Sequence, residues 1–130
     1  MSGDSGPIDY LTVDDLLEIA AGIVGNVEVR DVGLLASATA RPAATVFGAE
    51  AYPLFPEKVA ALLHALARNH PLVDGNKRLA WSAARVFCLM NGRDLRFGVD
   101  EAEGLMLAVA TGDLDVPDLT TALEQHGAFR

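Results

Sequence analysis

The chain has 130 residues, a formal net charge of −8 at pH 7 and hydrophobic side chains at 51% of its positions. These values are typical of one globular domain rather than of a disordered chain, so we expect a single domain over residues 1–130. The negative charge argues against a general binder of nucleic acids or anionic membranes, because both need a basic surface.

Cysteine content and hydropathy restrict the cellular location. Cys88 is the only cysteine, so neither an internal disulfide nor a cysteine-rich zinc site can form. No apolar stretch reaches the roughly 20 residues that cross a bilayer. The start of the chain, Met1–Asp4, lacks the basic and apolar regions of a signal peptide. We therefore expect a cytoplasmic protein without membrane contact, and a buried, unreactive thiol at Cys88.

Apolar periodicity predicts helices in the first half of the chain, with one irregular segment. The first helix begins after Thr12, a typical N-cap that has Asp15 three positions later. A second, shorter helix is expected at about residues 31–38. Residues 43–55 are expected to form a loop with one short extended piece at residues 45–47, because Gly and Pro interrupt any longer element.

Four further helices are predicted in the second half. One starts at Pro56 and runs to about residue 69, and the most apolar one, at residues 76–90, should be central. Asp100 and Glu103 resemble a capping box that opens a fifth helix. A last helix is expected from about residue 117 to Gly127. About six helices with little sheet indicate an all-α fold.

The strongest functional signal is the stretch His70–Arg78, which reads His-Pro-Leu-Val-Asp-Gly-Asn-Lys-Arg. Its second half opens the central helix near Asn76, where free backbone N–H groups and the helix dipole attract an anion, and Gly75 allows close approach. Lys77 and Arg78 add cations at this positive end. Each costs a few tenths to about 1 kcal/mol unless an anion compensates, which indicates a bound phosphate.

The same stretch contains a carboxylate and an imidazole. Asp74 is suited to hold Mg²⁺ beside phosphates. The imidazole of His70 is suited to accept a proton from an attacking hydroxyl, the usual role of a catalytic histidine. Together these groups are what phosphoryl or nucleotidyl transfer requires. Taken singly, each has an ordinary explanation: a helix end at His70, a turn at Asp74 and a solvated pair at Lys77-Arg78.

The remaining candidate side chains favour structural roles. We expect His64 and His126 to be structural or exposed, and Trp81 to lie in the core or a cleft wall. Arg68 and Arg85 add positive charge near the stretch. Arg68 is a further candidate for contact with a phosphate or a partner.

The stretch resembles the motif of the Fic/Doc family, and within it the Doc (death on curing) branch. The Doc pattern is His-x-Phe-x-Asp/Asn-Ala/Gly-Asn-Lys-Arg. The segments Leu66–Arg68, Asn91-Gly92 and Ala110–Asp113 also look Doc-like, so the likeness covers most of the chain. The motif positions that match in order are His70, Asp74, Gly75, Asn76, Lys77 and Arg78.

The Fic branch has the pattern His-Pro-Phe-x-Asp/Glu-Gly-Asn-Gly-Arg-x-x-Arg, which fits the first part of the stretch equally well. It has Gly where this chain has Lys77 and a second Arg where this chain has Trp81, and both differences favour Doc. Leu72 replaces the Phe of both patterns, a residue that looks like the anchor of the loop in the core. Ser82 stands where the Doc pattern has Asn.

The resemblance implies a compact all-α bundle of about six helices, with the active-site loop between two central helices. It implies the toxin of a Phd/Doc-type toxin–antitoxin system: a kinase that uses ATP and Mg²⁺ to phosphorylate a threonine of elongation factor Tu, which inhibits translation. The implied partner is a Phd-like antitoxin whose C-terminal segment binds in a groove on the toxin. Alternatives are Fic-like AMP transfer to a protein hydroxyl, and a catalytically weak module that acts by binding.

The resemblance also implies a role for each matching residue. His70 would be the catalytic base, and Asp74 would be both catalytic and the ligand of Mg²⁺. The residues that would hold the phosphates of ATP are Gly75, Asn76, Lys77 and Arg78.

Overall fold

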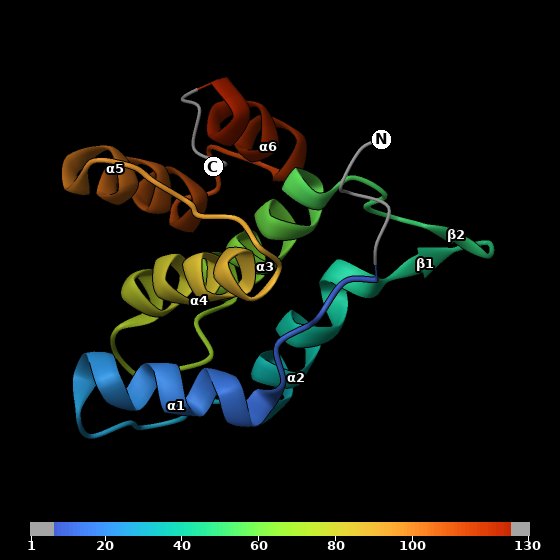
Figure 1. The fold of residues 1–130 in the computed structure, drawn as a ribbon. Coiled ribbons are helices and arrows are strands. Elements are labelled where there is room, and N and C mark those ends of the chain that lie inside the picture. Colours follow the sequence, from blue (N-terminus) through green and yellow to red (C-terminus); the bar gives the residue numbers. More distant parts are fainter. Residues whose placement is uncertain (1–6, 126–130) are drawn as a thin grey trace.

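Two helices joined by the His70–Arg78 stretch form the centre of the computed structural model, which describes residues 7–125 (Figure 1). They are α3 (Phe55–Asn69) and α4 (Asn76–Met90), and they pack closely against each other. Almost every side chain of α3 before Arg68 is buried, because its apolar residues recur at helical spacing and alanines fill the positions between them. The predicted central pair is confirmed.

The N-terminal helices cover one side of this pair. In α1 (Val13–Val24), Thr12 is the N-cap as predicted and forms a capping box with Asp15, and the helix packs on α4. α2 (Val32–Ala40) begins after Asp31, whose carboxylate accepts a hydrogen bond from the backbone N–H two residues later, and packs on α3. Both helices lie where the sequence predicts them, with boundaries shifted by one or two residues.

A β-hairpin follows α2 and a 3₁₀ turn at Arg41–Ala43. The expectation of one extended piece at residues 45–47 is incomplete, because β1 (Thr45–Val46) pairs with β2 (Ala49–Glu50). Phe47 lies in the turn with a φ of 51°, next to a glycine with a φ of 81°. Such a pair of positive φ values makes the two-residue turn that closes hairpins, although Asn-Gly is its usual sequence signal.

A buried lysine attaches this hairpin to α3. Lys58 donates to a carboxylate oxygen of Glu50 at 2.7 Å and to the carbonyl of Pro42 at 3.2 Å. Burial lowers the pKa of Lys58, but the hydrogen bonds with Glu50 and Tyr10 outweigh it and raise the pKa above the ordinary 10.5. The rest of the hairpin extends away from the helices (Figure 1).

The last two helices complete the core on the other side. α5 (Val99–Ala110) packs on α3 and α4, and α6 (Val116–Gln125) packs on α3. The predicted capping box of α5 is wrong, since the helix begins at Val99 after Gly98 and Asp100 lies inside its first turn. An acidic residue there still favours the helix dipole. The predicted end of the last helix near Gly127 lies outside the described residues.

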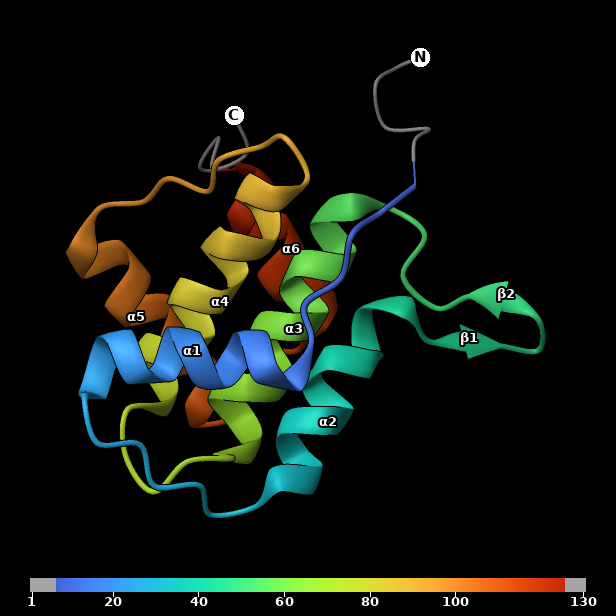
Figure 2. The ribbon, with the colours of Figure 1, turned by 60° about the horizontal axis from the view of Figure 1, so that its bottom comes forward.

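The whole arrangement confirms the all-α prediction. Residues 7–125 contain six α-helices and a single two-stranded hairpin around one hydrophobic core. Within these residues, no helix is long and apolar enough to cross a membrane. In Figure 2, the loop between α1 and α2 runs beside the loop between α3 and α4.

Candidate functional site

A short antiparallel bridge holds the loop between α3 and α4. It pairs Val29, in the connection between α1 and α2, with Leu72 in the loop. The backbone N–H of Arg30 donates to the carbonyl of Pro71 at 2.8 Å, and the N–H of Val73 donates to the same connection at 2.9 Å. The backbone of the loop is therefore fixed from outside by a segment about 40 residues earlier in the chain.

His70 ends α3 in a left-handed conformation, with a φ of 53° and a ψ of 63°. This conformation costs a residue other than glycine on the order of 1–3 kcal/mol, so the surroundings must impose it. The carbonyls of Asn69 and His70 each accept a hydrogen bond at 2.7 Å from the guanidinium of Arg30. The imidazole itself is exposed and has no hydrogen bond or ion pair within residues 7–125.

The loop is anchored in the core by Leu72, which is only 2% exposed. Its N–H donates to Oδ1 of Asn76 at 2.8 Å, and its carbonyl accepts from Nδ2 of the same side chain at 2.9 Å. Leucine thus occupies the position where the Fic and Doc patterns have phenylalanine. Asn76, predicted among the phosphate-binding residues, uses both ends of its amide to close the loop.

Gly75 begins α4 under two constraints. Its φ is 87°, and a Cβ atom at this position would lie 2.5 Å from Cγ1 of Val24. Only glycine satisfies both conditions without backbone strain at this φ and a shift of the Val24 side chain. Because glycine has no side chain to cap the helix, the first N–H groups of α4 remain open to an external anion.

The first turn of α4 contains cations and no acidic residue. Lys77 and Arg78 are exposed, and neither has an ion pair in the part of the chain that the structure describes. The arrangement agrees with the local electrostatic conflict predicted from the sequence, in which two cations share the positive end of a helix. A phosphate bound at this end would relieve that conflict.

Asp74 presents an exposed carboxylate one residue before Gly75. No group of three or more His, Cys, Asp or Glu side chains within residues 7–125 is arranged to hold a metal ion. Mg²⁺ is commonly held by one or two carboxylates together with phosphate and water oxygens. The donor set therefore fits a magnesium ion that arrives with a nucleotide.

The other arginines near the loop have partners in the protein. Arg68 donates to the carbonyl of Ala110 at 3.2 Å, at the C-terminal end of α5. Arg85 donates to Asp94 at 3.1 Å. Arg68 therefore interacts with the end of a neighbouring helix, where a cation is favourable. Trp81 packs edge-to-face with Phe97, and both half-buried rings lie against the core, as predicted for a core or wall residue.

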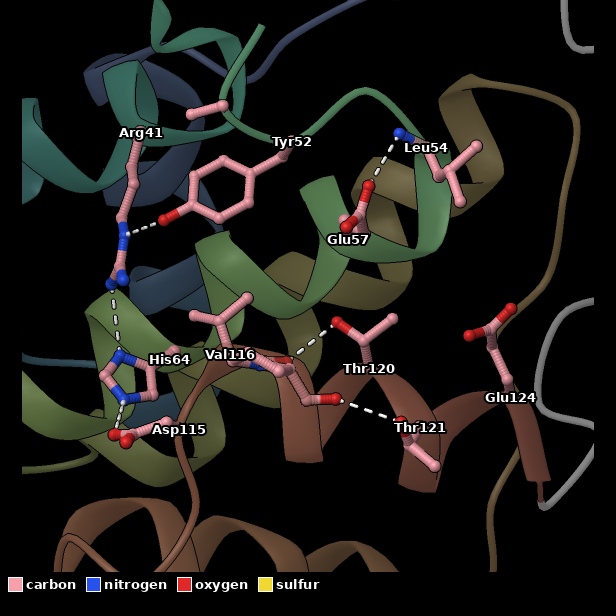
Figure 3. A pocket seen from close by; sticks show the side chains of 12 residues that line it. Arg41, Tyr52, Leu54, Glu57, His64, Asp115, Val116, Thr120, Thr121 and Glu124 are labelled. Atoms are coloured by element: carbon pink, nitrogen blue, oxygen red, sulfur yellow. Dashed lines mark hydrogen bonds and ion pairs between the residues drawn. The ribbon is translucent and has the colours of Figure 1, made fainter. Parts of the chain in front are cut away.

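Away from the His70–Arg78 stretch, a cleft of about 570 Å³ lies between α3, α6 and the segment around the hairpin (Figure 3). His64 lines it, with Nδ1 at 3.1 Å from the guanidinium of Arg41 and Nε2 at 3.9 Å from a carboxylate oxygen of Asp115. Burial lowers the pKa of His64, and the charge of Arg41 lowers it further. The prediction of a structural histidine is confirmed here, while His126 lies outside the described residues.

This cleft could not be found from the sequence. Arg41 and Asp115 each flank a helix rather than belonging to an apolar pattern, and none of the predicted site residues lines the cleft. Arg30 was missed for the same reason, because it lies in a short connection without periodicity. Cys88 is buried as predicted, and burial raises the pKa of its thiol to about 12, so it is not a nucleophile near neutral pH.

Comparison with known proteins gives the same assignment as the motif. The family model described as the Fic/DOC family matches residues 10–88, which include the loop and most of the helices that hold it. The protein "Toxin Doc" of Mycolicibacterium smegmatis (strain ATCC 700084 / mc(2)155) is 52% identical over 125 residues, covering 92% of this chain and 95% of the relative. The chain therefore belongs to the Fic/DOC family.

Proposed function

We propose that this protein is the toxin of a Phd/Doc-type toxin–antitoxin system and acts as a protein kinase. In this proposal it transfers a phosphate group from ATP to a threonine hydroxyl of elongation factor Tu in the cytoplasm and thereby inhibits translation. The observation that carries the proposal is a set of ionic groups without ion pairs among residues 7–125: Asp74, Lys77 and Arg78 are exposed within nine residues of the chain that begin at His70. The 52% identity to a protein named Toxin Doc supports it.

Each group has a defined task in the proposed reaction. The phosphates lie at the N-terminus of α4, where the backbone N–H groups and the side chains of Lys77 and Arg78 balance their charge. Asp74 would hold Mg²⁺, which would supply further charge neutralisation when bound. A ring nitrogen of His70 accepts the proton of the threonine hydroxyl as its oxygen attacks phosphorus. The bond between the transferred phosphoryl group and ADP breaks in the same step.

Lys77 favours phosphoryl transfer over AMP transfer. The Fic pattern has glycine at this position, which lets the backbone wrap around the phosphates of a nucleotide. Here a lysine side chain emerges from the first turn of α4. It adds a positive charge where a glycine would leave space, so the nucleotide and its reactive phosphate need a different placement. AMP transfer to a protein hydroxyl is the alternative that the test below separates.

Mass spectrometry of the intact target distinguishes these activities. Purified elongation factor Tu is incubated with the protein, ATP and Mg²⁺, and we expect its mass to rise by one phosphate group. An increase by AMP would overturn the kinase proposal in favour of a Fic-like transferase. The controls are His70→Ala and Asp74→Ala, for which we expect no mass change. If both variants still arrest growth when expressed, the protein acts by binding rather than by catalysis.

The proposed partner is a Phd-like antitoxin whose C-terminal segment folds into a groove on the toxin. A disordered tail must bury apolar surface to offset the entropy that it loses on folding. We expect a short reading frame beside this gene that encodes a DNA-binding domain with such a tail. Co-expression of that product should restore growth, and deletion of its tail should abolish the rescue.

A further inference from the structure

We propose that Arg30 is a positioning residue, whose guanidinium fixes the left-handed turn that aims His70 at the substrate hydroxyl. The inference rests on the proposed transfer reaction and adds a residue outside the His70–Arg78 stretch to its machinery. Arg30 lies in the connection between α1 and α2, and its side chain donates to the backbone of the loop.

The contact is a fork that binds two successive carbonyls. Nε of Arg30 donates to the carbonyl of His70, and a terminal nitrogen donates to that of Asn69, each at 2.7 Å. The last carbonyls of an α-helix have no partner within the helix, and a cation there is favoured by the helix dipole. No other side chain of residues 7–125 donates to these two carbonyls.

The fork acts where the backbone is strained. His70 has a positive φ and precedes Pro71, a position at which the helical regions of φ/ψ space are disfavoured. On the other side of the turn, the carbonyl of Pro71 accepts from the backbone N–H groups of Arg30 and Asp31 at 2.8 and 3.1 Å. The connection thus binds three consecutive carbonyls of the turn, and only the first two depend on the side chain of Arg30.

The chemistry of Arg30 suits this task. Its guanidinium has no ion pair with a carboxylate in the described part of the chain. A planar guanidinium can bond both carbonyls at once, whereas the single ammonium of lysine cannot reproduce that geometry. The anchor at Leu72 and the bridge at Val29 do not involve the side chain of Arg30. The loop therefore stays attached when that side chain is removed.

Removal of the fork should misplace the base while leaving nucleotide binding intact. A displacement of about 1 Å in a reacting group can cost on the order of 100-fold in rate. For Arg30→Ala we expect kcat to fall by about 10- to 100-fold. The KM for ATP should change by less than about twofold, because Lys77 and Arg78 bind the phosphates from α4. Arg30→Lys should be intermediate, since lysine retains the charge and one hydrogen bond at a time.

The test measures kcat and KM for ATP in the phosphorylation of elongation factor Tu by the full-length protein. Arg96→Ala is the matched control, because Arg96 is also exposed and its hydrogen bond goes to Asp94, away from the loop. We expect it to retain the activity of the unsubstituted protein. An unchanged kcat in Arg30→Ala, or an equal loss in Arg96→Ala, would overturn the proposal.

A second readout does not depend on activity. The backbone ¹³C chemical shifts of His70 report its φ and ψ angles, and we expect them to leave the left-handed range in Arg30→Ala. The shifts of Gly75 should stay constant. Unchanged shifts of His70 would overturn the inference even if kcat falls. If the unsubstituted protein transfers no phosphate, the proposed function fails, and these shifts alone decide whether Arg30 sets the turn.

Discussion

His64 within α3 and His70 directly after it lie six positions apart in contrasting surroundings. In the cleft, His64 is held through its side chain, because one ring nitrogen bonds Arg41 and the other faces Asp115. At the end of the helix, His70 is held through its backbone, by the guanidinium of Arg30, while its imidazole is exposed and has no bonded partner in the described part of the chain. One ring nitrogen of His64 is bonded within the fold and the other faces a carboxylate, whereas neither ring nitrogen of His70 has a partner among residues 7–125.

This contrast separates a structural residue from a candidate catalytic one. A side chain whose donors and acceptors are satisfied stabilises the fold but cannot exchange protons with a substrate without losing those bonds. A side chain left free on a strained and externally fixed backbone contributes little to stability, and its geometry is maintained at a cost. The same distinction holds for the loop as a whole, since Asp74, Lys77 and Arg78 are also exposed while Leu72 and Asn76 hold the backbone.

The largest expected effect is on catalysis, by removal of each imidazole in turn. We expect His70→Asn to lower kcat for phosphorylation of elongation factor Tu by about 10²- to 10⁴-fold, the usual contribution of a general base. Asparagine tolerates the left-handed conformation, so the turn should persist. His64→Gln should retain full kcat, because His64 lines a cleft that contains none of the predicted site residues. Steady-state kinetics of both variants provide the measurement.

Chemical denaturation of the same two proteins checks the other half of the contrast. His64→Gln should lower the free energy of unfolding more than His70→Asn does. Only at position 64 does the substitution replace existing side-chain bonds by new ones. Comparable activity losses in the two variants would contradict the division between the two regions.

A smaller effect, on stability, concerns how the loop meets α1. In Gly75→Ala we expect the positive φ to cost about 1–2 kcal/mol. The collision with Val24 should add about 1–3 kcal/mol, as overpacking usually does. Gly48→Ala is the matched control, because Gly48 also has a positive φ but nothing within 4 Å of a Cβ atom. Urea denaturation of Gly48→Ala should therefore show only the loss of stability that comes from the positive φ.

The double variant Gly75→Ala with Val24→Ala isolates the contact. Removal of the Val24 side chain should recover part of the loss seen in Gly75→Ala, which gives a coupling energy of opposite sign to the single effects. Additive losses would show that the close approach of the loop to α1 does not limit this position.

The sequence predicts the helices and the motif well, for physical reasons. Apolar residues at helical spacing, and capping residues such as Thr12 and Asp31, act within a few positions of each other and can be read locally. The motif likewise lies in one short stretch, where cations at the start of α4 conflict with the helix dipole. Helix signals, and cations placed against a helix dipole, can therefore both be recognised before the fold is known.

The sequence could not predict what holds that motif. Arg30 meets His70 from 40 positions away, and Arg41 meets His64 from 23 positions away. Neither arginine lies in a periodic pattern, so nothing in its neighbourhood indicates its partner. The capping box expected at Asp100 failed for a related reason: the pattern of residue types was present, but the helix had already begun at Val99. Contacts between distant segments require the fold itself.

The smallest expected effect is the contribution of His64 to the pH dependence of stability. Burial, followed by the charge of Arg41, lowers the pKa of folded His64 below its ordinary 6.5, while Asp115 opposes this shift. As pH falls through about 6.5, the unfolded chain therefore binds a proton that the folded chain does not, and the free energy of unfolding decreases. Above that pH the contribution of His64 is fully present.

Urea denaturation between pH 7.5 and 5.5, compared with the same measurement on His64→Gln, isolates this contribution because the other titrating groups cancel in the comparison. Glutamine keeps an acceptor for Arg41 and does not titrate, so the variant should lose less stability on acidification than the unsubstituted protein. An identical pH profile would mean that His64 is not the neutral acceptor of that arginine, and the two histidines would no longer differ in the way the cleft implies.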